Sequence, residues 1–468
     1  MSSPIAELEP LSRAATGLGF AVHSVEVTVD GEPVVSAAVP GLGVHAPHRM
    51  YSISKTVTGL AVGLLADEGR LSLDDAVTSH FPEFGPCHPW VEATTLRHML
   101  SMLGPHAATT YKLFEGGWLE SYFTVPPTHP PGTGFTYDTS ASYVLAALVE
   151  RVAGTSLVDY LRPRLLDPLG ASEHVRFLTG PEPVSHGGSG LICTPRDLLL
   201  LAHLLLDDGV GDGARLLPAD YLRAATTVQA DTAMHTWGAP FRGGYGYQFW
   251  LPPQGGFLMF GLGGQIVYGD PEHRLAVVVT ADTQPVQGGD QRLLDLVLRH
   301  LVAPLVEQST GRPATGLRPA STEAETELSW PLPAHDAAHA VPTTGRFAAC
   351  ADDAWPGDLE LDVTADGGTL RSPSDDWSLE LVCGAATPQP FGPESRPAVV
   401  TAGWAAPRTL DVVCWVVDDE LAVVRLRLHV GEDGTITARG QGFGETFDPR
   451  WTFCGAYRSG GDLTLHAR

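Results

Sequence analysis

The spacing of hydrophobic residues changes several times along the 468-residue chain. Residues 57–69 and 140–154 carry apolar residues at helical spacing, and a glycine ends each stretch, so both stretches predict helices. Residues 17–38 alternate β-forming and polar residues around an Asp-Gly pair, which predicts a β-hairpin. Residues 244–253 and 257–282 predict adjacent strands joined by short turns. The first part of the chain is therefore expected to mix helices and strands.

The pattern changes after the first three hundred residues. Residues 308–345 are rich in Pro, Ala, Thr and Glu and predict a linker. Residues 346–468 contain only short β-patterned segments separated by Gly and Asp turns, and they predict a small antiparallel sandwich or barrel. The expected organisation is an α/β (α+β) domain over 1–307, a linker over 308–345 and an all-β domain over 346–468.

The composition excludes several classes of partner. The chain is 43% hydrophobic, has a formal net charge of −25 and has a pI near 5.0. This charge argues against nucleic acid and anionic membranes as partners. Uninterrupted apolar runs of 18 residues do not occur in the sequence, so no membrane span is expected.

The cysteines and the N-terminus bear on location. Six cysteines are scattered without Cys-x-x-Cys spacing, so disulfides and a zinc site are not expected. The first residues show neither a basic start nor an apolar core, which is unlike a secretory signal. A reducing cytoplasmic location is the expectation that follows.

The strongest chemical signal is Ser52-Ile53-Ser54-Lys55, at the start of the first predicted helix. Residues three apart share a helix face, so Lys55 is expected within reach of the Ser52 hydroxyl. A serine needs a nearby base to become nucleophilic, and a buried lysine with a lowered pKa can be that base. The chain contains two lysines, Lys55 and Lys112, and its other basic residues are arginines, which stay charged. An exposed serine beside a solvated lysine is the structural alternative.

Two further segments could contribute to a site around Ser52. Tyr137 directly precedes the second predicted helix, where its phenol could move a proton, although an isolated tyrosine is more often a core or rim residue. Gly261 to Gly264 interrupt an apolar strand, as expected where a substrate carbonyl approaches a backbone N–H. A bulge or a tight turn explains these glycines equally well. Residues 111–131, aromatic and rich in proline, predict a packed lid or a surface flap.

Taken together, these segments resemble the serine β-lactamase and penicillin-binding-protein-like hydrolases, the group related to class C enzymes, esterases and amidases. The Ser-x-x-Lys motif is matched by Ser52 and Lys55, the Tyr-x-Asn motif by Tyr137-Asp138-Thr139, and the Lys/His-x-Gly motif by Gly261-Leu262-Gly263. The resemblance covers about residues 15–305 with the motifs in the family's order.

The resemblance implies an antiparallel sheet beside a mostly helical subdomain, with the active site between them. It implies that Ser52 attacks a carbonyl, that Lys55 and Tyr137 move the proton, and that an acyl-enzyme forms and is then released. The oxyanion would be held by the N–H of Ser52 and by that of Leu262 or Gly264. The family requires no metal and no organic cofactor.

Two departures from the family pattern narrow the expected substrates. Thr139 stands where many members have Asn, so a side-chain amide that could hold a substrate amide and Lys55 is missing. Gly261 stands where they have Lys or His, so a grip on a substrate carboxylate is weakened. We therefore expect a serine hydrolase acting on an ester or amide of a small molecule or peptide. The alternatives are an acyltransferase or peptide-cyclising thioesterase of secondary metabolism, with a carrier-bound acyl group, and an inactive binding protein of the same fold.

Overall fold

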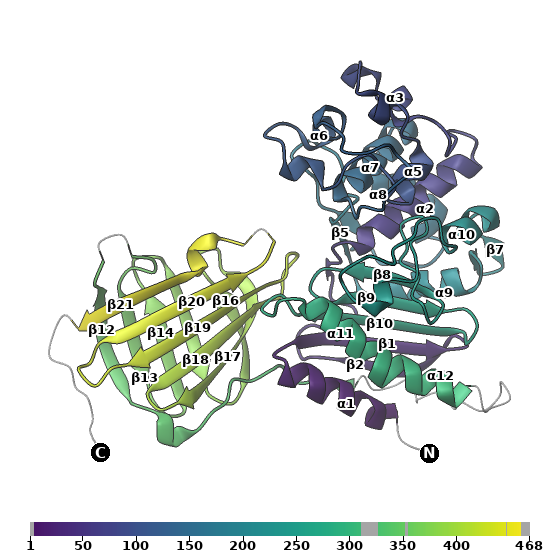
Figure 1. The fold of residues 1–468 in the computed structure, drawn as a ribbon. Coiled ribbons are helices and arrows are strands. Elements are labelled where there is room, and N and C mark those ends of the chain that lie inside the picture. The colour runs from purple at the N-terminus through teal and green to yellow at the C-terminus, as the bar shows by residue number, and fades with distance from the viewer. Residues whose placement is uncertain (1–3, 310–325, 352–353, 446, 460–468) are drawn as a thin grey trace.

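The computed structural model describes residues 4–309, 326–351, 354–445 and 447–459, which form two β-rich bodies side by side (Figure 1). The first body is built on a six-stranded sheet with the order β11-β2-β1-β10-β9-β8. Its strands are β1 (Ala21–Val29), β2 (Glu32–Ala38), β8 (Phe257–Gly261), β9 (Gln265–Asp270), β10 (Leu275–Asp282) and β11 (Thr326–Glu327). Strands β1 and β2 are the predicted hairpin, which is confirmed, with Asp30 and Gly31 both at positive φ in the turn.

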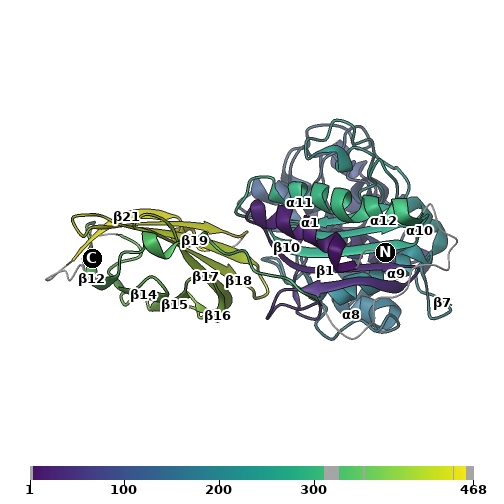
Figure 2. The same cartoon turned by 90° about the horizontal axis from the view of Figure 1, so that it is seen from below.

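Both faces of this sheet are covered, and the alternation along β10 shows why. Val277 and Val279 belong to a hydrophobic core shared with helices on one face, whereas Ala276 and Val278 belong to a core shared with helices on the other. Figure 2 shows α1, α11 and α12 lying across the first face. The helices on the two faces are α1 (Pro4–Gly17), α11 (Gly289–Val297) and α12 (Ala303–Ser309) on the first, and α2 (Ile53–Asp67) and α9 (Pro195–Leu206) on the second.

The helical subdomain lies beside the sheet and is organised around α2 and α7 (Thr139–Ala153). Helix α7 ends at Gly154 in the left-handed conformation, as predicted. The remaining short elements are α3 (Val77–His80), α4 (Pro89–Glu92), α5 (Leu96–Leu100), α6 (Trp118–Thr124), α8 (Leu157–Leu161), α10 (Ala219–Ala225) and the strands β3 (His48–Arg49), β4 (Arg176–Phe177), β5 (Leu191–Cys193), β6 (Val210–Gly211) and β7 (Ala214–Arg215). Among the described residues no single helix could cross a bilayer by its length and hydropathy; only the pair Thr139–Ala153 and Leu157–Leu166, bent by 65°, meets that test jointly.

One predicted strand is wrong. Residues 244–253 form isolated bridges at Tyr245 and Trp250 instead of a strand, while the second predicted segment forms β8, β9 and β10. Gln248 has a φ of 63°, which turns the backbone away from the extended conformation, and its buried side chain donates to the carbonyls of Met99 and Leu100. The alternating apolar pattern there is therefore produced by a buried loop packed against the helical subdomain.

The second body is a ten-stranded antiparallel sheet that curls into a barrel. Its two end strands, β15 and β16, lie side by side: the Gln389 side chain of β16 accepts from the backbone N–H of Glu380 in β15 and donates to the Glu380 carbonyl. The barrel, one of the two predicted architectures, consists of β12 (Thr343–Ala349), β13 (Leu359–Val363), β14 (Gly367–Ser372), β15 (Trp377–Val382), β16 (Ala386–Phe391), β17 (Arg396–Ala406), β18 (Thr409–Val416), β19 (Ala422–Val430), β20 (Ile436–Phe443) and β21 (Phe453–Ser459). Part of the predicted linker 308–345 lies outside the described residues, and its described part includes β11 and the start of β12. The predicted domain boundaries themselves stay a prediction.

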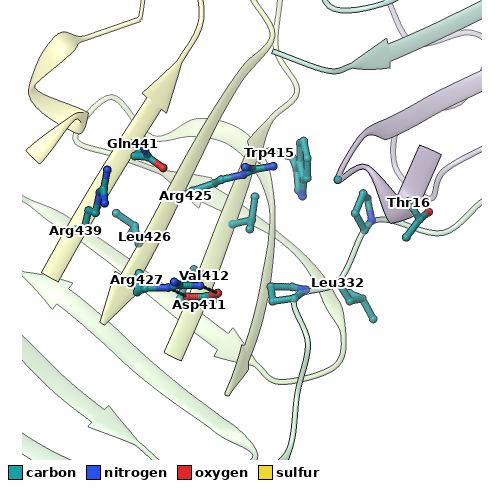
Figure 3. A pocket seen from close by; sticks show the side chains of 14 residues that line it. Thr16, Leu332, Asp411, Val412, Trp415, Arg425, Leu426, Arg427, Arg439 and Gln441 are labelled. Carbon is teal, nitrogen blue, oxygen red and sulfur yellow. Dashed lines mark hydrogen bonds and ion pairs between the residues drawn. The ribbon is translucent and has the colours of Figure 1, made fainter. Parts of the chain in front are cut away.

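The two bodies meet through an apolar contact. Trp330 and Trp415 lie with ring centroids 6.2 Å apart, and Trp415 packs into the same core cluster as the first sheet. Beside this contact lies a cavity of about 400 Å³ between the end of α1, residues 331–333 and strands β18 to β20 (Figure 3). Three arginines line it, and Arg427 is paired there with Asp411 at 2.7 Å. The barrel is thus packed onto the first body by buried aromatic surface.

Candidate active site

Ser52 lies at the start of α2, directly after a strained residue. Tyr51 has a φ of 47°, in the left-handed region that non-glycine residues seldom adopt, and its side chain is 1% exposed. Ser52 follows as the N-cap of α2, is partly exposed, and uses no side-chain capping bond. Its hydroxyl is therefore free of the helix backbone and available to Lys55.

Lys55 is buried and touches Ser52. Its Nζ donates to the Ser52 Oγ at 2.9 Å and to the Gly188 carbonyl at 2.6 Å. Burial lowers the pKa of Lys55 from 10.5 to about 7; Glu445 and Asp138 act in the opposite direction, and Lys112 and Arg49 in the same one. Close to neutral pH, a large share of this amine is therefore unprotonated and can accept a proton from Ser52.

Tyr137 brings its ring to the same place. The Lys55 Nζ lies 4.8 Å from the centroid of the Tyr137 ring, which stacks on Trp250 at 5.3 Å. Burial raises the pKa of the Tyr137 phenol, and a hydrogen bond with Ser52 acts in the opposite direction. The structure thus brings Ser52, Lys55 and Tyr137 together, with a neutral phenol beside the amine.

Thr139 is the first residue of α7, two residues after Tyr137. None of the described hydrogen bonds joins it to Lys55. Its N–H donates to the Thr109 hydroxyl at 3.2 Å, and its methyl group packs on Gly188, where a Cβ would come within 2.6 Å of it. Gly188 must therefore be small for its carbonyl to reach Lys55. Thr139 therefore contributes packing beside Gly188, and none of its described hydrogen bonds is to the Lys55 amine.

Gly261 to Gly264 form the end of β8 and the turn into β9, and Gly261 lies against Met50, two residues before Ser52. A Cβ at Gly261 would lie 2.3 Å from the Met50 carbonyl, so only glycine permits this approach. The Gly264 N–H already donates to the Gly261 carbonyl at 3.3 Å. The Leu262 N–H has no acceptor within the part of the chain that the structure describes, and Gly263 carries the turn at a φ of 78°. These glycines therefore serve both close approach and a tight turn.

Sequence reasoning missed several groups around the trio. Asp138 is a buried N-cap that accepts from the Ser140 N–H, and burial raises its pKa to about 6. Burial lowers the pKa of His186 to about 3, so this ring near Lys55 is neutral. The Gly188 carbonyl and Glu445 come from distant segments. Only Asp138, inside the Tyr-x-Asn-like motif, carried a sequence signal.

A cleft of about 560 Å³ opens beside the β8–β9 turn. Leu262 and Gly263 line it on one side, Lys112 of the predicted lid on another, and Phe443 to Glu445 of the barrel on the third. Within the lid, Tyr111 stacks on Trp118 with centroids 4.2 Å apart, so the aromatic segment is packed as predicted. The cleft therefore lies between the β8–β9 turn, the predicted lid and the barrel.

The structure thus places a buried lysine against a serine at the start of a helix, beside a largely antiparallel sheet and a helical subdomain. The chain belongs to the β-lactamase family, whose model matches residues 14–301, more than half of the chain. The 6-aminohexanoate-dimer hydrolase of Paenarthrobacter ureafaciens is 27% identical over 254 residues, which cover 49% of this chain and 65% of that protein.

Two solved structures share the fold. EstCE1, described as a hydrolase with promiscuous acyltransferase activity, is 18% identical with a TM-score of 0.53, covering 63% of this chain and 98% of its own. SurE in complex with D-Leu is 17% identical with a TM-score of 0.51, covering 93% of this chain and 97% of its own. At these identities the likeness shows the fold alone, and with SurE it extends over the barrel as well.

Proposed function

We propose that this protein is a serine hydrolase that cleaves an ester or amide bond through an acyl-enzyme on Ser52. The observation that carries the proposal is the 2.9 Å contact between the Ser52 Oγ and the buried Lys55 Nζ. A buried amine whose pKa is about 7 can take the hydroxyl proton at neutral pH, which an ordinary lysine cannot do.

Acylation then proceeds in two steps. Neutral Lys55 accepts the Ser52 proton as the Oγ–carbon bond forms, and the carbonyl oxygen becomes an oxyanion. The N–H groups of Ser52 and Leu262 are the proposed oxyanion donors, because neither has a described acceptor, whereas Gly264 has one. Removing one such donor from a serine protease costs about 3–4 kcal/mol. Tyr137 passes the proton from Lys55 to the leaving group, and the acyl-enzyme forms as that bond breaks.

Water releases the acyl group in the proposed hydrolase. Lys55 and Tyr137 take a proton from the water as its oxygen bonds to the acyl carbon. The ester bond to Ser52 then breaks, this proton passes to the Ser52 Oγ, and the free acid leaves. Gly261 offers no cation on the strand beside the site, which favours substrates without a carboxylate at that point. The amide-cleaving relative supports an amide or ester of a small molecule or peptide as the substrate class.

A second candidate is acyl transfer to an amine, in place of water. The cleft of about 560 Å³ favours it, because this cleft has room for an acceptor beside Leu262, one of the proposed oxyanion donors. The acyltransferase activity named for EstCE1 supports the same chemistry on this fold. A carrier-bound acyl donor and a peptide-cyclising reaction are forms of this candidate.

The test is intact-protein mass after treatment with a fluorophosphonate and, separately, with p-nitrophenyl esters. Wild type should gain one adduct, Ser52→Ala none, and Ser79→Ala, at an exposed serine of α3, one. Esters turned over with and without an added amine then separate hydrolysis (free acid) from transfer (amide). Absence of an adduct on wild type would reject the enzymatic function and favour a binding protein of this fold.

A further inference from the structure

We propose that the barrel completes the active site: Glu420 and Glu445 of the barrel are positioning residues that hold Arg49 and, through it, the strained Tyr51-Ser52 turn. This inference rests on the proposed function of Ser52 and Lys55. It assigns to the second domain a part in the reaction in addition to packing against the first.

Arg49 is a buried cation whose counter-charges come from the barrel. Its side chain is 4% exposed, and its guanidinium lies 2.8 Å from the Glu445 carboxylate and 3.1 Å from that of Glu420. Within its own domain the guanidinium donates to the Ser189 carbonyl at 2.7 Å and to the Ser189 hydroxyl at 3.1 Å. A buried guanidinium without a carboxylate is strongly unfavourable, so this one depends on the two glutamates.

Arg49 is three residues before Ser52 and contacts Tyr51, the residue that precedes Ser52. It is the last residue of β3, and its guanidinium lies 4.7 Å from the centroid of the Tyr51 ring. The Tyr51 hydroxyl donates to the Leu421 carbonyl at 3.3 Å, and the Arg49 N–H donates to the Asp419 carbonyl at 3.0 Å. Both barrel acceptors belong to the loop between β18 and β19. The strained φ of Tyr51 is therefore held from the barrel side at the residue before Ser52.

One of the two carboxylates, that of Glu445, also acts on Lys55. Of the charges that raise the pKa of Lys55, Glu445 is the largest, followed by Asp138 at the start of α7; Lys112 of the lid and Arg49 lower it. Neutral His186 and the Tyr137 phenol complete the titratable groups around the amine. Glu445 also lines the substrate cleft with Lys112 and Leu262. Glu445 thus raises the pKa of Lys55, pairs with Arg49 beside the Tyr51 turn, and lines the cleft.

Loss of these carboxylates should leave the domains docked. The apolar contact of Trp330 with Trp415, and the Gln284 side chain, which donates to the Leu421 carbonyl at 3.2 Å, do not involve Glu445. A Glu445→Gln variant is therefore expected to fold with the barrel in place. The effect of the substitution on the site can then be measured separately from domain attachment.

The experiment uses the full chain with lysine enriched in ¹³C at Cε. Because Lys55 and Lys112 are the two lysines, NMR gives two signals, and the Lys55→Arg spectrum assigns them. In Glu445→Gln the midpoint of the Lys55 titration should fall by about half to one pH unit, because a nearby carboxylate no longer favours the ammonium. Glu432→Gln, an exposed barrel carboxylate on the turn before β20, is the matched control and should keep the wild-type midpoint.

Fluorophosphonate labelling of the same proteins gives the second readout. Glu420→Gln/Glu445→Gln should label at least tenfold more slowly than wild type at saturating pH, because Arg49 and the Tyr51 turn lose their support; Glu445→Asp should recover part of the rate. An unchanged Lys55 midpoint in Glu445→Gln together with an unchanged labelling rate in the double variant overturns the proposal. A lowered labelling rate that occurs only when the barrel detaches, seen as a separate unfolding transition, also overturns it. An unlabelled wild type rejects the proposed function instead, while the NMR midpoint still tests the charge coupling.

Discussion

The unusual state of Lys55 yields the most direct prediction. Its pKa is lowered from 10.5 to about 7, mainly by burial. A difference of about 3.5 units corresponds to about 5 kcal/mol favouring the neutral amine, since each unit is about 1.4 kcal/mol. About half of the amines should be neutral at pH 7, compared with roughly one in three thousand for an ordinary lysine.

The ¹³C signal of Lys55 should therefore titrate near pH 7. Labelling of Ser52 by a fluorophosphonate should rise about tenfold per pH unit between pH 5 and 7 and then level off, because only neutral Lys55 can accept the proton. Lys55→Arg should lower the labelling rate by about a hundredfold to ten-thousandfold, since arginine stays charged. Lys112→Arg, which keeps its cation, should leave the midpoint near 7.

The same shift affects stability, with a definite sign. Between pH 7 and 10.5 the unfolded chain binds the Lys55 proton and the folded chain does not, so the free energy of unfolding should rise with pH there. Relative to Lys55→Met, wild type should be less stable by up to about 5 kcal/mol below pH 7, and the difference should shrink toward pH 10. Urea unfolding of both proteins at several pH values measures this difference. A Lys55 signal that titrates near pH 10, or labelling that is flat from pH 5 to 9, would refute the reasoning.

Three further predictions test neighbouring groups. Gly261→Ala should destabilise the protein by about 1–3 kcal/mol and slow labelling, because its Cβ would meet the Met50 carbonyl. Gly17→Ala, with open space around it, should do neither. Equal melting temperatures of the two variants would contradict this prediction. Tyr137→Phe should lower ester turnover by about a hundredfold or more with an unchanged melting temperature, because the ring keeps its stacking on Trp250; equal turnover would remove the phenol from the mechanism. Asp138→Asn should stabilise the protein by up to about 3 kcal/mol at pH 8 but little at pH 4. The reason is that burial raises the pKa of Asp138 to about 6, so the folded state disfavours the charged carboxylate above that pH. Equal gains in the free energy of unfolding at both pH values would contradict this prediction.

The local elements were predictable because the residues that determine them are close in sequence. Helix α7 and its Gly154 cap, the β1–β2 hairpin and the β-only second domain follow from periodicity and turn residues. Helix α5 departs from this: its apolar spacing and the Gly104-Pro105 stop predict a longer helix, but it ends at Leu100, shortly before Met102 turns at a φ of 57°. The strand expected over 244–253 fails for a similar reason, since the Gln248 side chain finds its partners on a different segment.

For the site, the sequence by itself determined one short-range relation: a serine and a lysine three residues apart at a helix start, which lie 2.9 Å apart because a helix turn places them on one face. The tertiary structure decided the chemistry of that pair. Burial lowers the pKa of Lys55, and the Gly188 carbonyl that accepts from its Nζ and the Glu445 carboxylate that opposes the shift come from segments more than a hundred residues away. Desolvation and charge act through space, so only the folded chain sets the state of the amine.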